Sequence, residues 1–170
     1  MPQMRIETGR FALCQPFVIT GHTFTEITPV WVSLEANAHT GRGEAIGVYY
    51  TGETTPSMVD QLEGVREHVE AGASRQDIHL LLPAGGARNA LDCAYWDLEC
   101  KTSGRTVWEL VDIQPRELTT VATIGIGTAE QMAAGATALA DFGKLKVKLD
   151  ADHPIEKLAA IRAARPEASL

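Results

Sequence analysis

The stretch Gly143-Lys144-Leu145-Lys146-Val147-Lys148-Leu149-Asp150 decides how this chain is expected to fold. Successive side chains of a β-strand point to opposite faces, so the three lysines share one face and the aliphatic residues share the other. Helix-like sequence flanks the stretch, which predicts a buried strand of a β-α-β unit, and such strands are normally apolar on both faces. Burying ammonium groups is costly unless anionic groups meet them, so the lysine face indicates chemistry. The alternative is a solvated edge strand that uses lysine to prevent aggregation.

The sequence around this stretch alternates strand and helix patterns. A strand is expected over residues 118–126, and a helix is expected from the capping box of Thr128 and Gln131 to about Gly143. After the lysine strand, a further helix is expected over residues 152–165. This alternation predicts a parallel sheet with right-handed crossovers.

The N-terminal part has a different pattern. Three strands, expected over residues 4–13, 27–34 and 41–46, predict an antiparallel meander, with alternate aliphatic side chains of the second strand facing the core. Two amphipathic helices follow. The first is capped by Thr55 and ends at Gly72, and the second covers residues 87–101.

The change of pattern near residues 111–117 predicts two domains, over residues 1–114 and 115–170. Two parallel strands and two helices cannot cover both faces of a parallel sheet. A closed eight-stranded barrel needs roughly 250 residues. We therefore expect this chain to be the N-terminal part of a larger protein, ending where a third parallel strand begins.

Composition excludes some classes of partner. The net charge of −7 argues against nucleic acid and anionic membranes, because both require basic patches. No apolar signal sequence or membrane-spanning stretch is present in the sequence. The three cysteines form no Cys-x-x-Cys motif, and the two on one predicted helix are too far apart to bridge, which indicates a reducing cytoplasm.

Several motifs together resemble the enolase superfamily. They are the Gly-x-Gly-Glu-Ala strand at residues 41–45, the helix at residues 82–98 and the Lys146-x-Lys148 pair. The lysine pair resembles that of the muconate-lactonizing-enzyme subgroup. With Pro16-Phe17-Val18-Ile19 and the segment at residues 127–133, the chain is most similar to the dipeptide epimerases of the L-Ala-D/L-Glu epimerase type. The likeness covers essentially all 170 residues.

The resemblance implies an α+β capping domain, with a three-stranded antiparallel meander plus helices, followed by the start of a (β/α)7β TIM-type barrel. Barrel chemistry occurs at the C-terminal ends of the strands. The resemblance therefore implies that Lys148 is the acid/base for a proton next to a carboxylate and that Lys146 assists it electrostatically. The implied reaction is epimerisation of dipeptides by a two-base 1,1-proton transfer.

The resemblance also implies Mg²⁺, which would stabilise the enediolate formed when the proton leaves. The three carboxylate ligands and the second catalytic lysine of such enzymes are expected beyond residue 170, so no metal ligand is assigned here. Asp92 and Asp97 are expected to have packing or domain-docking roles, and Asp150 is expected to be a turn residue. The 170-residue chain alone is expected to be inactive.

Substrate selection is expected from two loops of the capping domain, residues 20–25 and 49–55. Related epimerases that prefer an acidic second residue carry an arginine where this chain has Phe24, and no Arg or Lys occurs from Gln15 to Ala38. An apolar dipeptide side chain is therefore expected. The candidate substrate-binding residues are Ile19, Phe24, Tyr50 and Thr123, although an exposed loop aromatic or a strand threonine is also common without such a role.

Other functions remain open from the sequence. Muconate cycloisomerase and o-succinylbenzoate synthase share the Lys-x-Lys strand. A nucleotide-binding βαβ module is suggested by the glycines of residues 125–130, with Asp150 about twenty residues further on, but Glu130 would oppose a pyrophosphate. A non-catalytic scaffold is a third class. The expected partner is a small dipeptide, without nucleic acid or membrane, and a homo-oligomer is possible.

Overall fold

The computed structural model describes residues 1–170, which form two compact units. The first contains residues 1–11 and 27–115, and the second contains residues 12–26 and 116–170. Residues 12–26 therefore pack with the C-terminal part of the chain. As a division into family domains, residues 1–114 and 115–170 stay a prediction.

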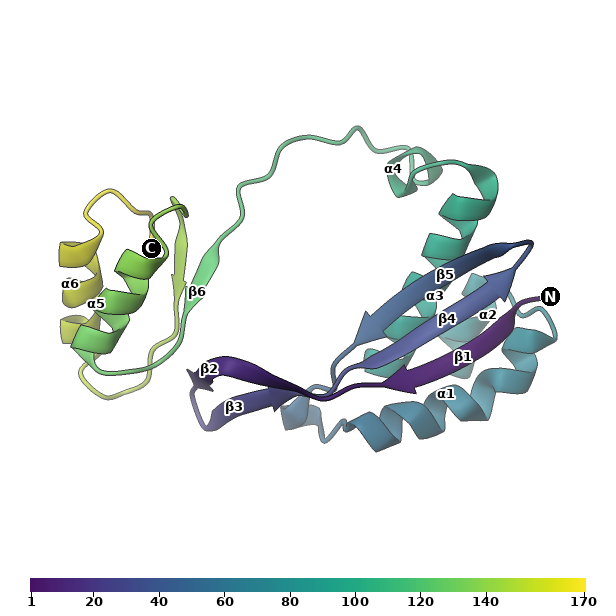
Figure 1. The fold of residues 1–170 in the computed structure, drawn as a ribbon, viewed down its shortest axis with the longest axis horizontal. Coiled ribbons are helices and arrows are strands. Elements are labelled where there is room, and N and C mark those ends of the chain that lie inside the picture. Colours follow the sequence, from purple (N-terminus) through teal and green to yellow (C-terminus); the bar gives the residue numbers. More distant parts are fainter. The chain divides into compact units, whose positions relative to one another are not determined.

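A three-stranded antiparallel sheet is the centre of the first unit. Its strands are β1 (Gln3–Thr8), β4 (Val30–Ala36) and β5 (His39–Ala45), in the order β1-β4-β5 (Figure 1). The predicted antiparallel sheet is confirmed, but the first strand ends at Thr8 rather than near Leu13. The segment expected to be a polar loop instead belongs to a separate two-stranded sheet of β2 (Phe11–Ile19) and β3 (His22–Ile27).

Helices cover one face of the β1-β4-β5 sheet (Figure 1). A short 3₁₀ turn, η1 (Tyr49–Thr51), precedes α1 (Thr55–Glu70), α2 (Arg75–Leu81), α3 (Gly86–Ser103) and α4 (Val107–Leu110). The core between the sheet and the helices is apolar, as the alternation in β4 predicts. Its fully buried members include Val30, Val32, Leu34, Met58, Leu62, Val69, Ala90, Leu91 and Ala94.

The N-cap of α1 is Thr54, not Thr55. The Thr54 hydroxyl accepts from the Ser57 N–H, and the Ser57 side chain accepts from the Thr54 N–H, which completes a capping box. The Thr55 hydroxyl instead donates to the Thr28 carbonyl at 2.6 Å. The second predicted helix is confirmed as α3, which ends at Gly104 in a left-handed conformation with φ of +69°.

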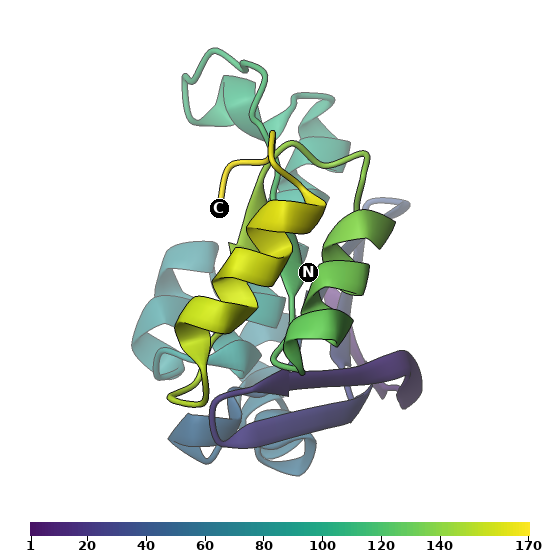
Figure 2. The ribbon, with the colours of Figure 1, turned by 90° about the vertical axis from the view of Figure 1, so that its left-hand side faces the viewer.

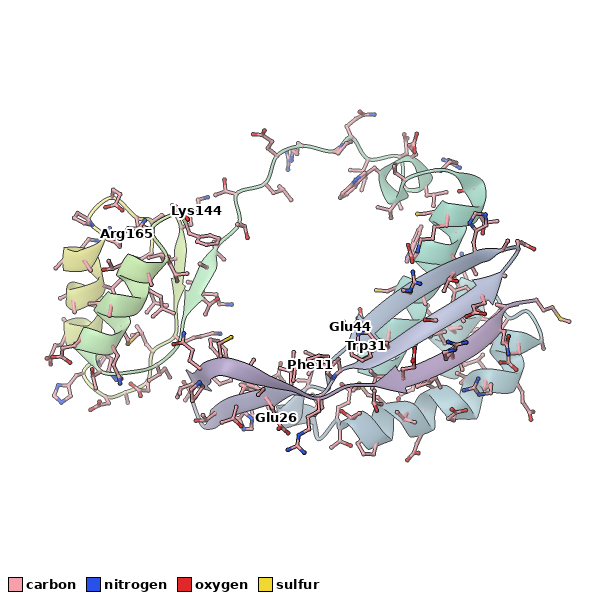
Figure 3. The ribbon with its side chains drawn as sticks, in the orientation of Figure 1. Phe11, Glu26, Trp31, Glu44, Lys144 and Arg165 are labelled. Carbon is pink, nitrogen blue, oxygen red and sulfur yellow. The ribbon has the colours of Figure 1, made fainter.

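Trp31 lies on the face of the sheet opposite the helices. Its indole N–H donates to the Glu44 carboxylate at 2.6 Å, and its ring packs edge-on against Phe11 with 5.8 Å between centroids (Figure 3). This placement follows from the alternation of side chains along β4, since Val30 and Val32 on either side of Trp31 are buried in the core.

The second unit contains two parallel strands and two helices. β6 (Ala122–Ile124) pairs with β7 (Leu145–Val147), and α5 (Ala129–Ala138) and α6 (Pro154–Ala164) lie side by side (Figure 2). The helices bury the aliphatic face of the strands. The predicted β-α-β-α order with parallel pairing is confirmed. The buried cluster consists of Ile124, Met132, Ala136, Leu145, Ile161 and Ala168.

Strand lengths in this unit differ from expectation. β6 begins at Ala122 instead of Leu118, because β7 offers only three partner residues. The Leu118 side chain is 80% exposed. On the other side of β7, Ser169 forms a parallel bridge with Lys144 and its carbonyl accepts from the Leu145 N–H at 2.8 Å. A third parallel position therefore begins where the sequence predicted a third strand.

The C-terminal end of α5 is closed by a buried arginine. The Arg165 guanidinium, which is 6% exposed, donates to the carbonyls of Ala136 at 3.1 Å, Leu139 at 2.8 Å and Phe142 at 2.9 Å. The Ala136 and Leu139 carbonyls also accept from backbone N–H groups, those of Leu139 and Phe142, at 3.2 and 3.0 Å. The cation therefore adds a charged donor at the helix end and complements the helix dipole. Figure 3 labels Arg165 in this unit.

None of the helices is both long enough and apolar enough to cross a lipid bilayer.

Candidate functional site

The lysine face of β7 is accessible in this structure. Lys144 and Lys146 are exposed and Lys148 is half-buried, because α5 and α6 cover only the opposite face of the strands. The expectation of a strand buried on both faces is therefore wrong for this chain. Figure 3 labels Lys144, at the N-terminal end of the strand and thus at the opposite end from Lys148.

Thr123 and Lys146 are direct neighbours. Their Cα atoms are register partners in the parallel β6–β7 pair, and both side chains are exposed. Paired residues of adjacent strands place their side chains on the same face, so Thr123 shares the lysine face. Lys148 follows β7 directly, and its N–H donates to the Ile124 carbonyl at 3.0 Å. Lys148 therefore stands at the C-terminal end of both strands.

The tip of the β2–β3 hairpin lies at this same end. The Val18 carbonyl accepts from the Ile126 N–H at 2.9 Å, just beyond β6. The Thr20 hydroxyl donates to the Leu149 carbonyl at 3.1 Å, just beyond β7. Ile19 lies between these two anchoring residues. The structure thus brings Ile19 to the edge of the sheet where Lys148 stands.

Phe24 belongs to an aromatic group on the hairpin. Its ring lies 6.3 Å from the Phe17 ring and 4.3 Å from the His22 ring, between centroids, and all three side chains are half-buried. Tyr50 instead lies on η1 in the first compact unit, where it is 77% exposed and packs edge-on against Tyr49. The proposed role of Tyr50 stays a prediction.

The three aspartates that were not assigned to a metal all have partners within the chain. Asp92 contacts Arg75 at 3.4 Å and His79 at 3.1 Å. The other two aspartates also accept hydrogen bonds within the chain. Asp97 accepts from the Arg42 N–H at 2.8 Å and from Lys101 Nζ at 2.6 Å, and Asp150 accepts from Lys157 Nζ at 2.8 Å.

The chain contains no group of three or more His, Cys, Asp or Glu side chains that could hold a metal ion. Mg²⁺ requires several oxygen ligands at close to octahedral geometry. The residues of this chain therefore do not fit a magnesium site by themselves.

Sequence reasoning assigned no role to Lys157 and placed Thr20 only in the loop of residues 20–25, although both residues build this end of the unit. On α6 the apolar Ile155 is 83% exposed, whereas Lys157 is 4% exposed. The available signal was the spacing of four residues from Lys157 to the fully buried Ile161, which places both on one helix face. The helix expected over residues 152–165 begins at Pro154, after its N-cap residue His153.

The ion pair of Asp150 and Lys157 shifts both groups. The hydrogen bond from Lys157 is the main cause that holds the pKa of the Asp150 carboxyl below its usual range. The same bond raises the pKa of Lys157, against the opposing effect of burial.

This pair predicts acid sensitivity of the second unit. A lowered carboxyl pKa contributes stability fully above the unfolded value of about 3.9 and loses it as the pH falls through the folded value. The raised pKa of Lys157 contributes stability below about 10.4, and this is lost only as the pH rises through its folded value. We expect the urea concentration at the unfolding midpoint, followed by the amide resonances of α5 and α6, to decrease as the pH is lowered from about 5 to about 3. The fall should be smaller in Asp150→Asn, and an equal fall in both proteins would contradict the assignment.

The fold and the lysine strand define the class of protein. An antiparallel sheet covered by helices, followed by parallel β/α units with lysines on one strand face, is the capping domain and barrel start of the enolase superfamily. The chain belongs to the mandelate racemase / muconate lactonizing enzyme family, since residues 3–112 match the N-terminal domain of that family.

Individual members of the family are similar to this chain over nearly all of its length. The L-Ala-D/L-Glu epimerase of Escherichia coli strain K12 is 38% identical over 173 residues, which cover 100% of this chain and 54% of that protein. A solved enolase family member from Agrobacterium tumefaciens, with homology to dipeptide epimerases and with bound sodium and L-Ala-L-Glu, is 35% identical with a TM-score of 0.92. The match covers 99% of this chain and 52% of that chain.

A third relative contains a different dipeptide. The dipeptide epimerase from Methylococcus capsulatus, complexed with Mg and L-Arg-D-Lys, is 27% identical with a TM-score of 0.84, over 98% of this chain and 51% of that chain. This chain spans about half the length of the curated relatives it matches.

The nucleotide-binding alternative is disfavoured by the start of α5. The Thr128 N–H donates to the Gln131 side chain at 2.9 Å, and the Gln131 N–H donates to the Thr128 hydroxyl at 3.3 Å. The preceding Ile126 N–H is bound to Val18. Because a pyrophosphate is bound by such N–H groups at a helix N-terminus, three of the donors that the fingerprint would use are already engaged within the chain.

Proposed function

We propose that the intact protein containing this chain is a metal-dependent dipeptide epimerase. The observation that carries the proposal is the edge where Lys148 stands. There the C-terminal end of β7 is joined to the tip of the β2–β3 hairpin by the hydrogen bond from the Thr20 hydroxyl to the Leu149 carbonyl. A base and a surface for substrate side chains therefore lie at the ends of the same parallel strands, where barrel enzymes perform their chemistry.

Lys148 has the proposed role of acid/base on one side of the substrate α-carbon. Its Nζ takes the α-proton, and the electron pair of the C–H bond moves into the adjacent carboxylate to form an enediolate. Lys146, two residues earlier on the same face, has the proposed role of assisting Lys148 electrostatically. Thr123, next to Lys146, is a proposed hydrogen-bond donor to substrate. Return of a proton from the opposite side requires a second base, which we propose lies beyond residue 170.

Mg²⁺ is the proposed cofactor, since a similar epimerase is complexed with Mg and a dipeptide. Its ligands are proposed to lie beyond residue 170, because this chain forms no ligand group. The 170-residue chain alone is accordingly proposed to be inactive. We further propose a cytoplasmic location, in line with three free cysteines, and the formation of a homo-oligomer is compatible with the proposal.

The proposed substrates are dipeptides with an apolar second residue. Ile19 lies at the hairpin tip and the aromatic group of Phe17, His22 and Phe24 lies on the same hairpin, and no Arg or Lys occurs from residue 15 to residue 38. An acidic side chain would lose its hydration there without gaining a cation. Tyr50 is a proposed contributor from the first unit.

Exchange of α-protons in D₂O tests the proposed reaction. The intact protein with Mg²⁺ and a small dipeptide library should incorporate deuterium at one α-carbon with loss of stereochemical purity, as followed by mass spectrometry and NMR. Absence of exchange with every dipeptide would reject epimerisation in favour of the cycloisomerase or o-succinylbenzoate synthase reaction, which share the Lys-x-Lys strand.

The same library tests the role of Phe24. Phe24→Arg should raise kcat/KM for Ala-Glu relative to Ala-Leu by about tenfold or more, because it supplies a cation on the hairpin surface. Phe24→Leu is the matched control, since it keeps an apolar side chain and should retain the apolar preference. An unchanged preference in Phe24→Arg would show that the hairpin does not contact the second side chain.

A further inference from the structure

Lys157 is a buried cation that the proposed proton transfer does not use. It lies in the first turns of α6, is 4% exposed, and has its Nζ 2.8 Å from Asp150 and 3.3 Å from Asp152. Burying an ammonium group is costly, and an apolar residue paired against the same core is often as stable as a buried ion pair. Stability alone therefore does not account for a lysine on the covered face of α6.

Asp150, which accepts the hydrogen bond from Lys157, shows which segment the ion pair restrains. Asp150 directly follows the end of β7, two residues after Lys148, and its carboxylate also accepts from the Asp152 N–H at 3.2 Å. The carboxylate thus links α6 and the loop before it to the end of the lysine strand. A charged hydrogen bond between buried and half-buried partners is short and directional, so it restrains the backbone at Asp150.

Three consecutive residues at the end of β7 are tied to three different elements. The Lys148 N–H donates to Ile124 at the end of β6, and the Leu149 carbonyl accepts from Thr20 at the hairpin tip. Asp150 completes the series through Lys157 of α6. The backbone that carries the Lys148 side chain is therefore restrained on either side, and only the Lys157 restraint comes from a buried side chain.

We infer that Lys157 is a positioning residue, whose ion pair with Asp150 fixes the end of β7 and with it the place of the Lys148 side chain. The inference rests on the proposed function for the importance of Lys148, although the restraint itself is a property of the fold. Proton transfer depends on the alignment of the amine with the C–H bond, and a misplacement of about 1 Å can cost about 100-fold in rate. Loss of Lys157 should accordingly lower kcat more than it raises KM.

The first test measures the restraint without any activity. In the 170-residue chain, amide hydrogen exchange at Lys148 reports the hydrogen bond to Ile124. Lys157→Met should accelerate this exchange by about tenfold or more, while Lys157→Arg, which keeps a cation for Asp150, should stay within about threefold of the native rate. Lys101→Met removes another lysine–aspartate pair, at 2.6 Å from Asp97, and should leave Lys148 exchange unchanged.

The second test measures catalysis in the intact protein. Lys157→Met should lower kcat for dipeptide epimerisation by about 10- to 100-fold with KM changed less than about threefold, and Lys157→Arg should recover most of the loss. A folded Lys157→Met protein with native kcat and native Lys148 exchange would overturn the inference, and so would failure of arginine to restore either quantity.

Two other results of these tests also decide the inference. If Lys157→Met does not fold, Asp150→Asn decides, because it weakens the same link from the other side and should reproduce both changes; native behaviour would overturn the inference. If the native intact protein epimerises no dipeptide, the proposed function has failed, and the amide exchange at Lys148 alone then decides whether Lys157 restrains the end of β7.

Discussion

Replacing Lys148 by alanine should reduce α-proton exchange of dipeptides by the intact protein by about 1,000-fold or more. The amine is the proposed base on one side of the α-carbon, and among the three lysines of the strand face it stands nearest the C-terminal end of β7. With the base removed, exchange from that stereochemical face should stop, while binding of the dipeptide should change little. Mass spectrometry in D₂O measures the exchange, and equilibrium dialysis measures the binding.

Lys144→Ala is the matched control for this prediction. Lys144 shares the strand face with Lys148 but stands at the opposite end, where its side chain is exposed. Its removal alters the charge of the face by the same amount and should change the rate by less than about threefold. Intact exchange in Lys148→Ala would reject the interpretation of the lysine strand, and equal losses in both variants would reduce it to a general effect of positive charge.

Much of this fold could be predicted from local pattern because the core obeys simple periodicity. Val30, Val32 and Leu34 alternate along β4 and are fully buried, and the four apolar positions of α1 at helical spacing are buried as well. The capping box of Thr128 and Gln131 likewise forms as its sequence signature indicates. Each of these signals is contained within one element, so no tertiary information was needed.

The errors arose where a segment depends on distant partners. The β2–β3 hairpin has a weak apolar pattern, and its tip is anchored by Ile126 and Leu149, more than one hundred residues away. Lys157 was misplaced because its burial depends on Asp150 and Asp152, which composition of the helix alone does not reveal. The accessible lysine face has a similar origin, since burial of a strand face depends on which other elements cover it.

The candidate site was predictable only in part for the same reason. The alternation of lysines places Lys146 and Lys148 on one face, and the register of β6 against β7 adds Thr123 to it. The approach of Ile19 to this edge came from the hairpin, which sequence periodicity did not predict. Metal ligation could not be assigned from these residues, and the structure forms no such group among them.

Substituting Gly43 by alanine should destabilise the first unit by about 3 kcal/mol or more. β5 crosses α3 so closely that a Cβ atom on Gly43 would lie 1.9 Å from the Ala90 carbonyl oxygen and 2.8 Å from the Ala94 nitrogen. Both neighbours are helix backbone, which cannot move aside as a flexible side chain would. The Gly-x-Gly of this strand is therefore explained by contact, since Gly41 meets Ala94 in the same way at 2.2 Å.

Gly64→Ala is the control that separates contact from the general effect of losing a glycine. Gly64 lies in α1, and a Cβ there would meet nothing within 4 Å, so alanine should stabilise the helix by about 1 kcal/mol. All three tryptophans, Trp31, Trp96 and Trp108, belong to the first unit, so tryptophan fluorescence in urea follows its unfolding. Opposite shifts of the two midpoints are expected, and a native midpoint in Gly43→Ala would mean that α3 can withdraw from β5 at little cost.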